Sequence, residues 1–127
     1  MIDIVALASS LCKLAIEGGN KVLEEYKKKK LSEAEKELLI AAAKDGEFLL
    51  MHTNELPNWV RVGRIDFLDN KAGDPAIAAK YVDAFTNLCK RGYIRHEVGD
   101  LFMLTGIGFK KARQLARKTD KKKANKH

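Results

Sequence analysis

The stretch from Asp74 to Gly92 constrains the fold more than any other part of the sequence. An acceptor side chain at Asp74 followed by a proline predicts the start of a helix, and Gly92 predicts its end. Between these two positions, apolar residues recur with helical spacing and share one face: Ile77, Tyr81, Ala84, Phe85, Leu88 and Cys89. Because such a helix needs a cover for its apolar face, the rest of the chain has to supply a core.

A hairpin and a closing helix are predicted directly after this helix. Tyr93 to Val98 and Leu101 to Thr105 have the composition of strands, and Gly99-Asp100 between them is typical of a tight turn. The closing helix is expected over Ile107 to Lys118, and Thr105 is placed to cap it. These elements indicate an α+β fold, mainly α, with a small antiparallel sheet.

One further helix and an extended region are predicted upstream. The residues from Ser32 to Glu35 have the capping-box signature, and the helix that they start ends at Gly46. After this glycine the helical spacing disappears. We expect a short strand over Phe48 to Met51 and a second extended segment over Trp59 to Phe67, bulged at Gly63.

The N-terminal residues 2 to 26 predict a long amphipathic helix, either continuous or divided in two at Gly18-Gly19-Asn20. Its apolar arc is wide, so the helix lies in a groove of its own domain or meets a second copy of the chain or a protein partner. The residues expected at such an interface are Leu7, Leu11, Ala15 and Val22. Binding to a membrane surface is not expected, because the polar face carries acids as well as lysines.

The net charge of +7 is unevenly distributed along the chain. Residues 1–30 carry six Lys/Arg and four acids, residues 31–118 fourteen and twelve, and residues 119–127 four and one. We therefore divide the chain into an amphipathic helix with a basic linker (1–30), a nearly neutral folded domain (31–118) and a basic tail expected to be disordered (119–127).

Enzyme and metal sites are not indicated. The three histidines are far apart in the sequence, and neither His-Glu-x-x-His nor Cys-x-x-Cys occurs. Gly106-Ile107-Gly108 lacks the spacing of a phosphate loop or a dinucleotide fingerprint, so it predicts a structural turn at a helix start. Cys12 and Cys89 are expected to be buried free thiols. We expect no catalysis, no cofactor, no metal and no small-molecule substrate.

No membrane span or signal peptide is expected. No stretch reaches about 18 uncharged apolar residues, and Asp3 and Lys13 flank and interrupt the apolar N-terminal run. We therefore predict a cytoplasmic protein.

The segments Leu88-Cys89-Lys90-Arg91-Gly92-Tyr93-Ile94, Leu101-Phe102-Met103-Leu104-Thr105 and Gly108-Phe109 together carry a resemblance to winged-helix domains. In that superfamily a leucine-rich helix ends at a glycine, a β-hairpin wing follows, and a Leu-Thr-x-x-Gly segment leads into a closing helix. The resemblance covers about residues 31 to 118 and is most specific from Asp74 to Ala116. It implies a helix-rich fold and, often, duplex DNA binding with one helix in the major groove and the wing against the backbone.

The chain departs from this pattern after Gly46, where an extended segment replaces the first helix of the helix-turn-helix. We nevertheless predict a non-enzymatic winged-helix protein that binds DNA, with a transcription-regulatory role, and dimerises through the N-terminal helix. The alternative is a protein-interaction or oligomerisation module without DNA binding, which the neutral core favours. The residues expected to face the DNA groove are Lys80, Asn87, Lys90 and Arg91, with Arg95 and His96 in the wing and Lys110, Lys111, Arg113 and Arg117 on phosphates.

Overall fold

The computed structural model describes residues 3–17, 25, 28–52, 58–68 and 75–124, with side chains as far as Thr119. The predicted cap at Asp74, the glycine interruption of the N-terminal helix and Val22 lie outside the described residues. The same holds for residues 125–127 of the predicted tail.

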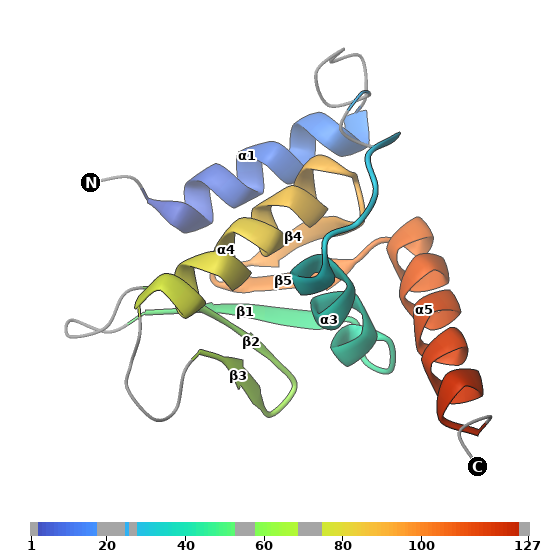
Figure 1. The fold of residues 1–127 in the computed structure, drawn as a ribbon. Helices are drawn as coiled ribbons and strands as arrows, with labels where there is room; N and C mark the ends of the chain where they lie inside the picture. Colours follow the sequence, from blue (N-terminus) through green and yellow to red (C-terminus); the bar gives the residue numbers. More distant parts are fainter. Residues whose placement is uncertain (1–2, 18–24, 26–27, 53–57, 69–74, 125–127) are drawn as a thin grey trace.

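The described part is an α+β fold with one antiparallel sheet, as the sequence predicted (Figure 1). The helices are α1 (Ile4–Glu17), α3 (Glu33–Ala42), α4 (Pro75–Lys90) and α5 (Gly106–Ala124). The strands are β1 (Glu47–Met51), β2 (Trp59–Val62), β3 (Ile65–Phe67), β4 (Ile94–Val98) and β5 (Leu101–Leu104). They form one five-stranded sheet in the order β3-β2-β1-β5-β4.

Helix α4 is the centre of the core. It packs on the sheet, with α1 along one side of it and α3 along the other (Figure 1). Phe85 of α4 lies between Phe48 of β1 and Phe102 of β5, at ring-centroid distances of 5.6 Å and 5.0 Å. All three rings are fully buried, so the apolar face predicted for this helix does cover the core.

The segment from Trp59 to Phe67 is a hairpin, and the prediction of one bulged extended segment was wrong. Val62 pairs with Ile65 across a two-residue turn, and Gly63 at its first central position has a φ of 61°. A glycine with positive φ at this position is what a type II′ hairpin turn requires. The chain therefore reverses at Gly63, where we had expected it only to bulge.

The predicted start of α3 and the predicted end of α4 are confirmed. In α3, the Ser32 hydroxyl accepts from the Glu35 amide (3.2 Å), and the Glu35 carboxylate accepts from the Ser32 amide (3.4 Å). At the end of α4, the amides of Gly92 and Tyr93 donate to the carbonyls of Cys89 and Leu88, which is a Schellman motif. Each signal is local, and for this reason each could be read from the sequence.

The closing helix begins where predicted and ends later. The Thr105 hydroxyl accepts from the Gly108 amide (3.2 Å) and donates to the Gly92 carbonyl (2.8 Å), so one side chain caps α5 and ties it to the end of α4. The predicted boundary at Lys118 was wrong, since α5 continues to Ala124. Residues 119–124 contain no glycine or proline, and lysine and alanine sustain helical backbone.

Helix α1 uses its apolar side within its own chain. Ala8, Cys12 and Ala15 are buried, and α1 packs on α4 and β4. Of the two arrangements left open by the sequence, the groove of its own domain is therefore occupied. Cys12 and Cys89 are both buried free thiols, as expected, and burial beside Cys12 raises the pKa of the Cys89 thiol well above its usual value.

Candidate nucleic-acid interface

The net charge of the chain is concentrated in one helix. The residues of α5, 106–124, carry eight Lys/Arg and one acid, which is a net charge of +7. The other 108 residues carry sixteen Lys/Arg and sixteen acids. Because the whole net charge of +7 thus lies in α5, a polyanion is attracted to this helix before any other part of the fold.

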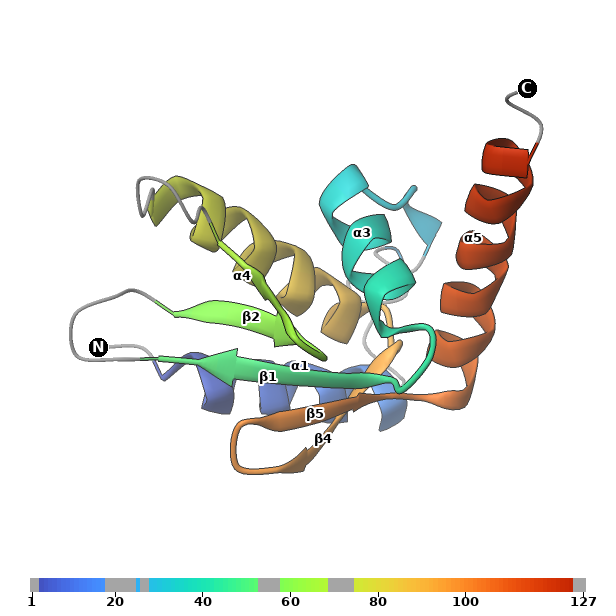
Figure 2. The same ribbon diagram turned by 90° about the horizontal axis from the view of Figure 1, so that it is seen from below.

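Helix α5 has one covered side and one open side. Ala112 is buried, and Phe109 and Leu115 pack against the core. The exposed side chains of α5 include Lys110, Arg113, Gln114, Arg117 and Lys118. Figures 1 and 2 show that α5 stands at the edge of the molecule beside α3, with its C-terminal end pointing away from the sheet. The basic side is therefore accessible as far as Lys118.

A groove runs between α5 and the segment that leads into α3. Its volume is about 680 Å³, and Lys29, Lys30, Lys36, Lys111 and Lys118 line it together with Glu33 and Glu37. The Lys36 Nζ atom lies 3.4 Å from Glu33 Oε1, and the Tyr81 hydroxyl donates a hydrogen bond to the Glu37 carboxylate, so both acids already have partners. An adjoining hollow adds Lys110 and Gln114 and shares Tyr93 with the groove. We call the basic surface the set Lys29, Lys30, Lys36, Lys110, Lys111, Arg113, Arg117 and Lys118.

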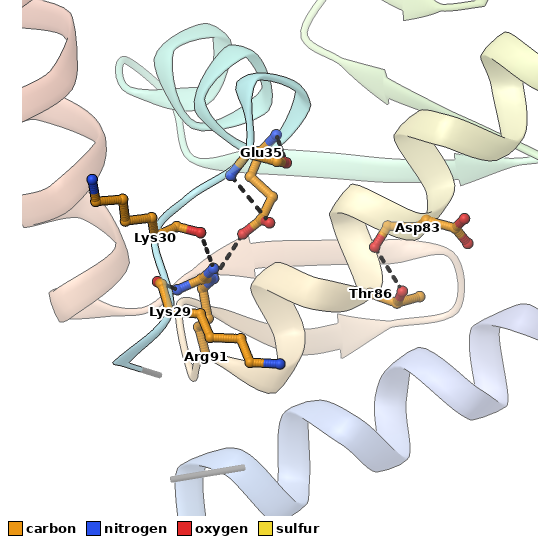
Figure 3. A network of polar contacts seen from close by, with 7 residues as sticks. Lys29, Lys30, Glu35, Asp83, Thr86 and Arg91 are labelled. Carbon is orange, nitrogen blue, oxygen red and sulfur yellow. Dashed lines mark hydrogen bonds and ion pairs between the residues drawn. The ribbon is translucent and has the colours of Figure 1, made fainter. Parts of the chain in front are cut away.

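A buried ion pair fixes the lysines of residues 29 and 30 beside this groove (Figure 3). Arg91 donates to the Glu35 carboxylate at 2.7 Å, and both side chains are nearly inaccessible, at 3% and 4% exposure. The same guanidinium donates to the backbone carbonyls of Lys29 and Lys30. Arg91 thus joins the end of α4, the start of α3 and the preceding chain segment.

The placement of Arg91 corrects its expected role as a group facing DNA. The helix wheel put it on the outer face, but α4 ends at Lys90 and the turn at Gly92 directs the Arg91 side chain inward. Its charge is paired with the Glu35 carboxylate inside the fold. It is a positioning residue for Lys29 and Lys30 and is not part of the basic surface.

Of the other α4 residues expected to face DNA, Lys80 and Asn87 lie beside acids. Lys80 is exposed, and Asn87 and Lys90 are half-buried. The shallow depression along this face contains Lys80 and Asn87, with Asp83 and Glu33 among its lining residues. A face with more acids than bases in its hollow is a poor match for phosphates.

The wing residues have partners within the described fold. Arg95 forms an ion pair with Glu97 and lines neither of the two hollows beside α5. The His96 ring lies between the Ser9 hydroxyl (3.3 Å) and the Gly99 carbonyl (2.8 Å) and packs on Phe102. The Ser9 contact joins the wing to α1, and neither side chain lies at the basic surface.

The predicted interface residues of α1 are divided by the fold. Ala15 is buried in the chain and Leu11 packs against the core, so Ala15 is not available to a second copy. Leu7 and Leu14 remain open, at 42% and 46% exposure. Dimerisation through this flank of α1 stays a prediction.

Sequence reasoning identified four α5 residues of the basic surface and missed Lys118 and the three lysines outside α5. The run from Lys27 to Lys30 was interpreted as a solvated linker or helix end, because nothing local shows that it lies beside α5. Lys36 was missed for the same reason, whereas Lys118 lies on the predicted closing helix and was not assigned to the interface. The sequence signal for these residues was the run of lysines before α3, which the fold brings beside α5.

Tyr81 provides a pH-dependent marker of the wall of the groove. Its hydroxyl lies 2.6 Å from the Glu37 carboxylate, and this hydrogen bond, with burial and the nearby negative charge, raises the pKa of Tyr81 from 10.0 to about 12. Because the pKa is raised in the folded protein, the contribution of this hydrogen bond to folding stability is complete below about pH 10. It is lost as the pH rises through about 12.

The replacement Glu37→Gln is expected to return the pKa of Tyr81 toward 10.0. Ultraviolet absorbance of tyrosinate during an alkaline titration measures the change, and the difference between the wild-type and variant curves isolates Tyr81 from the other tyrosines. Superimposable titration curves would contradict the hydrogen bond.

Comparison of the chain with protein-family models, curated proteins and solved structures finds no match. Within the part that the structure describes, no helix has the length and apolar character needed to cross a membrane. Among the described side chains, no group of three or more His, Cys, Asp or Glu could hold a metal ion.

Proposed function

We propose that the protein binds nucleic acid, without catalysis, through the basic surface on α5 and the adjoining groove. The observation that carries the proposal is the concentration of the entire net charge of +7 in α5. Phosphate contact supplies most of the affinity in non-specific nucleic-acid binding, and lysine and arginine are the residues that provide it. The exposed position of α5 leaves room for a polyanion.

The order of the elements supports a winged-helix variant for this role. Helix α3, strand β1, helix α4 and the β4–β5 hairpin follow the order of that superfamily, with the β2–β3 hairpin in place of the first helix of the helix-turn-helix. In this variant, α4 packs between α1 and α3, and its exposed face carries Asp83 beside Lys80. The contact with nucleic acid moves to α5.

A salt titration tests the proposal. Binding of the full chain to a fluorescent duplex of mixed sequence is measured by anisotropy at several salt concentrations. The slope of log affinity against log salt is expected to be about −0.9 for each phosphate contacted, so several contacts give a steep dependence. A slope near zero, or no binding at low salt, would refute the proposal.

Matched charge variants locate the contact. Lys110→Gln with Lys118→Gln is expected to weaken binding about tenfold and to make the slope shallower by about 2, because each lost phosphate contact removes about 1 from the slope. Arg113 is kept, since its guanidinium donates to the Ala43 carbonyl and lies over the Phe109 ring. The control Arg64→Gln with Lys80→Gln removes the same charge from exposed positions elsewhere. Equal loss in both variants would mean that only total charge matters.

A further inference from the structure

The exposed face of α5 carries more than positive charge. Lys110, Arg113, Gln114 and Arg117 are spaced by three and four residues, so they form one stripe opposite buried Ala112. Glutamine and arginine are the side chains that bind base edges with two hydrogen bonds, to adenine and guanine respectively.

The side chains of Arg113, Gln114 and Arg117 differ in how far other groups of the fold hold them. The Arg113 Nε atom donates to the Ala43 carbonyl at 3.1 Å, and its guanidinium carbon lies 4.9 Å from the centre of the Phe109 ring. Arg113 is thus anchored at the edge of α3. Gln114 and Arg117 extend from the exposed side of α5. The Arg117 Nε atom donates to the Arg113 carbonyl at 3.3 Å, which leaves its terminal Nη donors, and the Gln114 side-chain amide offers a donor and an acceptor.

The shape of α5 fits the major groove of B-form DNA. An α-helix with its side chains is about 10–12 Å wide, and the groove is about 12 Å wide. Helix α5 packs on α3 and β5 along one side only, and the remainder of the described helix stands clear of the sheet (Figure 2). The groove lysines, Lys29, Lys30 and Lys36, then lie to one side of the helix, where a flanking phosphate strand would pass.

We propose that α5, and not α4, is the helix that enters the major groove of duplex DNA, with Gln114 and Arg117 contacting base edges and the flanking lysines contacting phosphates. This inference rests on the proposed function and goes beyond it, because phosphate binding alone requires neither a duplex nor base contacts. Duplex RNA is a poor partner in this arrangement, since the major groove of A-form helices is too narrow and deep for side chains to read.

The experiment removes the major-groove acceptors and leaves the phosphates. A duplex is first selected on the full chain from a pool of random sequence, and the selected duplex is then made again with 7-deazapurines, which lack the N7 acceptor of adenine and guanine. Wild-type chain is expected to bind the modified duplex about 5- to 150-fold more weakly, the discrimination of one bidentate base contact. It is also expected to bind the corresponding RNA duplex at least about tenfold more weakly.

Two double variants test which helix contacts the base edges. Gln114→Ala with Arg117→Lys keeps the charge of α5 but removes both bidentate groups, so it is expected to retain the salt slope and to bind normal and 7-deaza duplexes equally. The matched control on α4, Asn87→Ala with Lys80→Arg, is expected to keep the preference for the normal duplex. Circular dichroism of both variants confirms that they are folded.

Each other outcome has a definite meaning. Equal wild-type affinity for normal and 7-deaza DNA with a steep salt slope would overturn groove reading and leave the proposed function intact. Loss of the preference in the α4 variant but not in the α5 variant would assign reading to α4. Equal binding of DNA and RNA duplexes would reduce α5 to a phosphate contact. A slope near zero for every duplex would overturn both proposals.

Discussion

Replacing Arg91 with methionine is expected to lower the free energy of unfolding by about 3–5 kcal/mol. The substitution leaves the Glu35 carboxylate buried without its cation, and removing one partner of a buried ion pair typically costs this amount. It also takes the donors away from the backbone carbonyls of Lys29 and Lys30. Urea denaturation followed by circular dichroism measures the loss.

Two further variants separate the buried pair from general effects of removing an arginine. Arg95→Met breaks the exposed pair with Glu97 and is expected to cost less than about 1 kcal/mol. The double variant Glu35→Leu with Arg91→Met is expected to recover part of the loss, since an apolar pair removes the uncompensated charge. A cost below about 1 kcal/mol for Arg91→Met alone would show that the pair does not hold the segment.

The Arg91 variant also tests the link between the core and the basic surface. Lys29 and Lys30 line the groove because Arg91 fixes their backbone (Figure 3). When this attachment is lost, the two lysines have to be ordered on binding, and ordering chain segments costs free energy. Stability and nucleic-acid affinity should therefore fall together in this variant, although Arg91 itself does not reach the surface.

The sequence predicted those parts of the fold that are set by neighbouring residues. The capping box at Ser32, the turn at Gly99 and the hydroxyl cap at Thr105 each depend on groups within a few positions, and all three are present. The Gly63 turn was missed because a glycine in an extended run is compatible with both a bulge and a reversal. Only the pairing of Val62 with Ile65 distinguishes them.

The candidate site was harder to predict because its parts are far apart in the sequence. Glu35 and Arg91 are 56 positions apart, and neither has a local pattern that identifies the other. Helical periodicity directs a side chain only as long as the helix continues, and α4 ends one residue before Arg91. The charge of α5 was visible, but its continuation into a groove with Lys29 and Lys30 depends on tertiary packing.

The glycines of the segment Gly106-Ile107-Gly108 allow a prediction that separates packing from phosphate binding. A Cβ atom at Gly108 would lie 2.1 Å from the Tyr93 carbonyl oxygen, which accepts the amide of Thr105 at 2.9 Å. A Cβ atom at Gly106 would meet nothing within 4 Å. The first turn of α5 therefore tolerates a side chain at Gly106 and has no room for one at Gly108.

Gly108→Ala is accordingly expected to lower the free energy of unfolding by about 3 kcal/mol, the upper part of the range for overpacking, because the obstacle is backbone and cannot rotate away. Gly106→Ala is expected to be neutral or to stabilise by up to about 1 kcal/mol, since alanine favours helix over glycine. Thermal unfolding of both variants measures the difference. A phosphate cradle predicts a different result, in which both alanines weaken anion binding and neither changes stability. If only Gly108→Ala is destabilised and the salt slope of Gly106→Ala is unchanged, the side chains of α5 make the phosphate contacts. Gly108 is then required only because the helix approaches Tyr93 closely at this position.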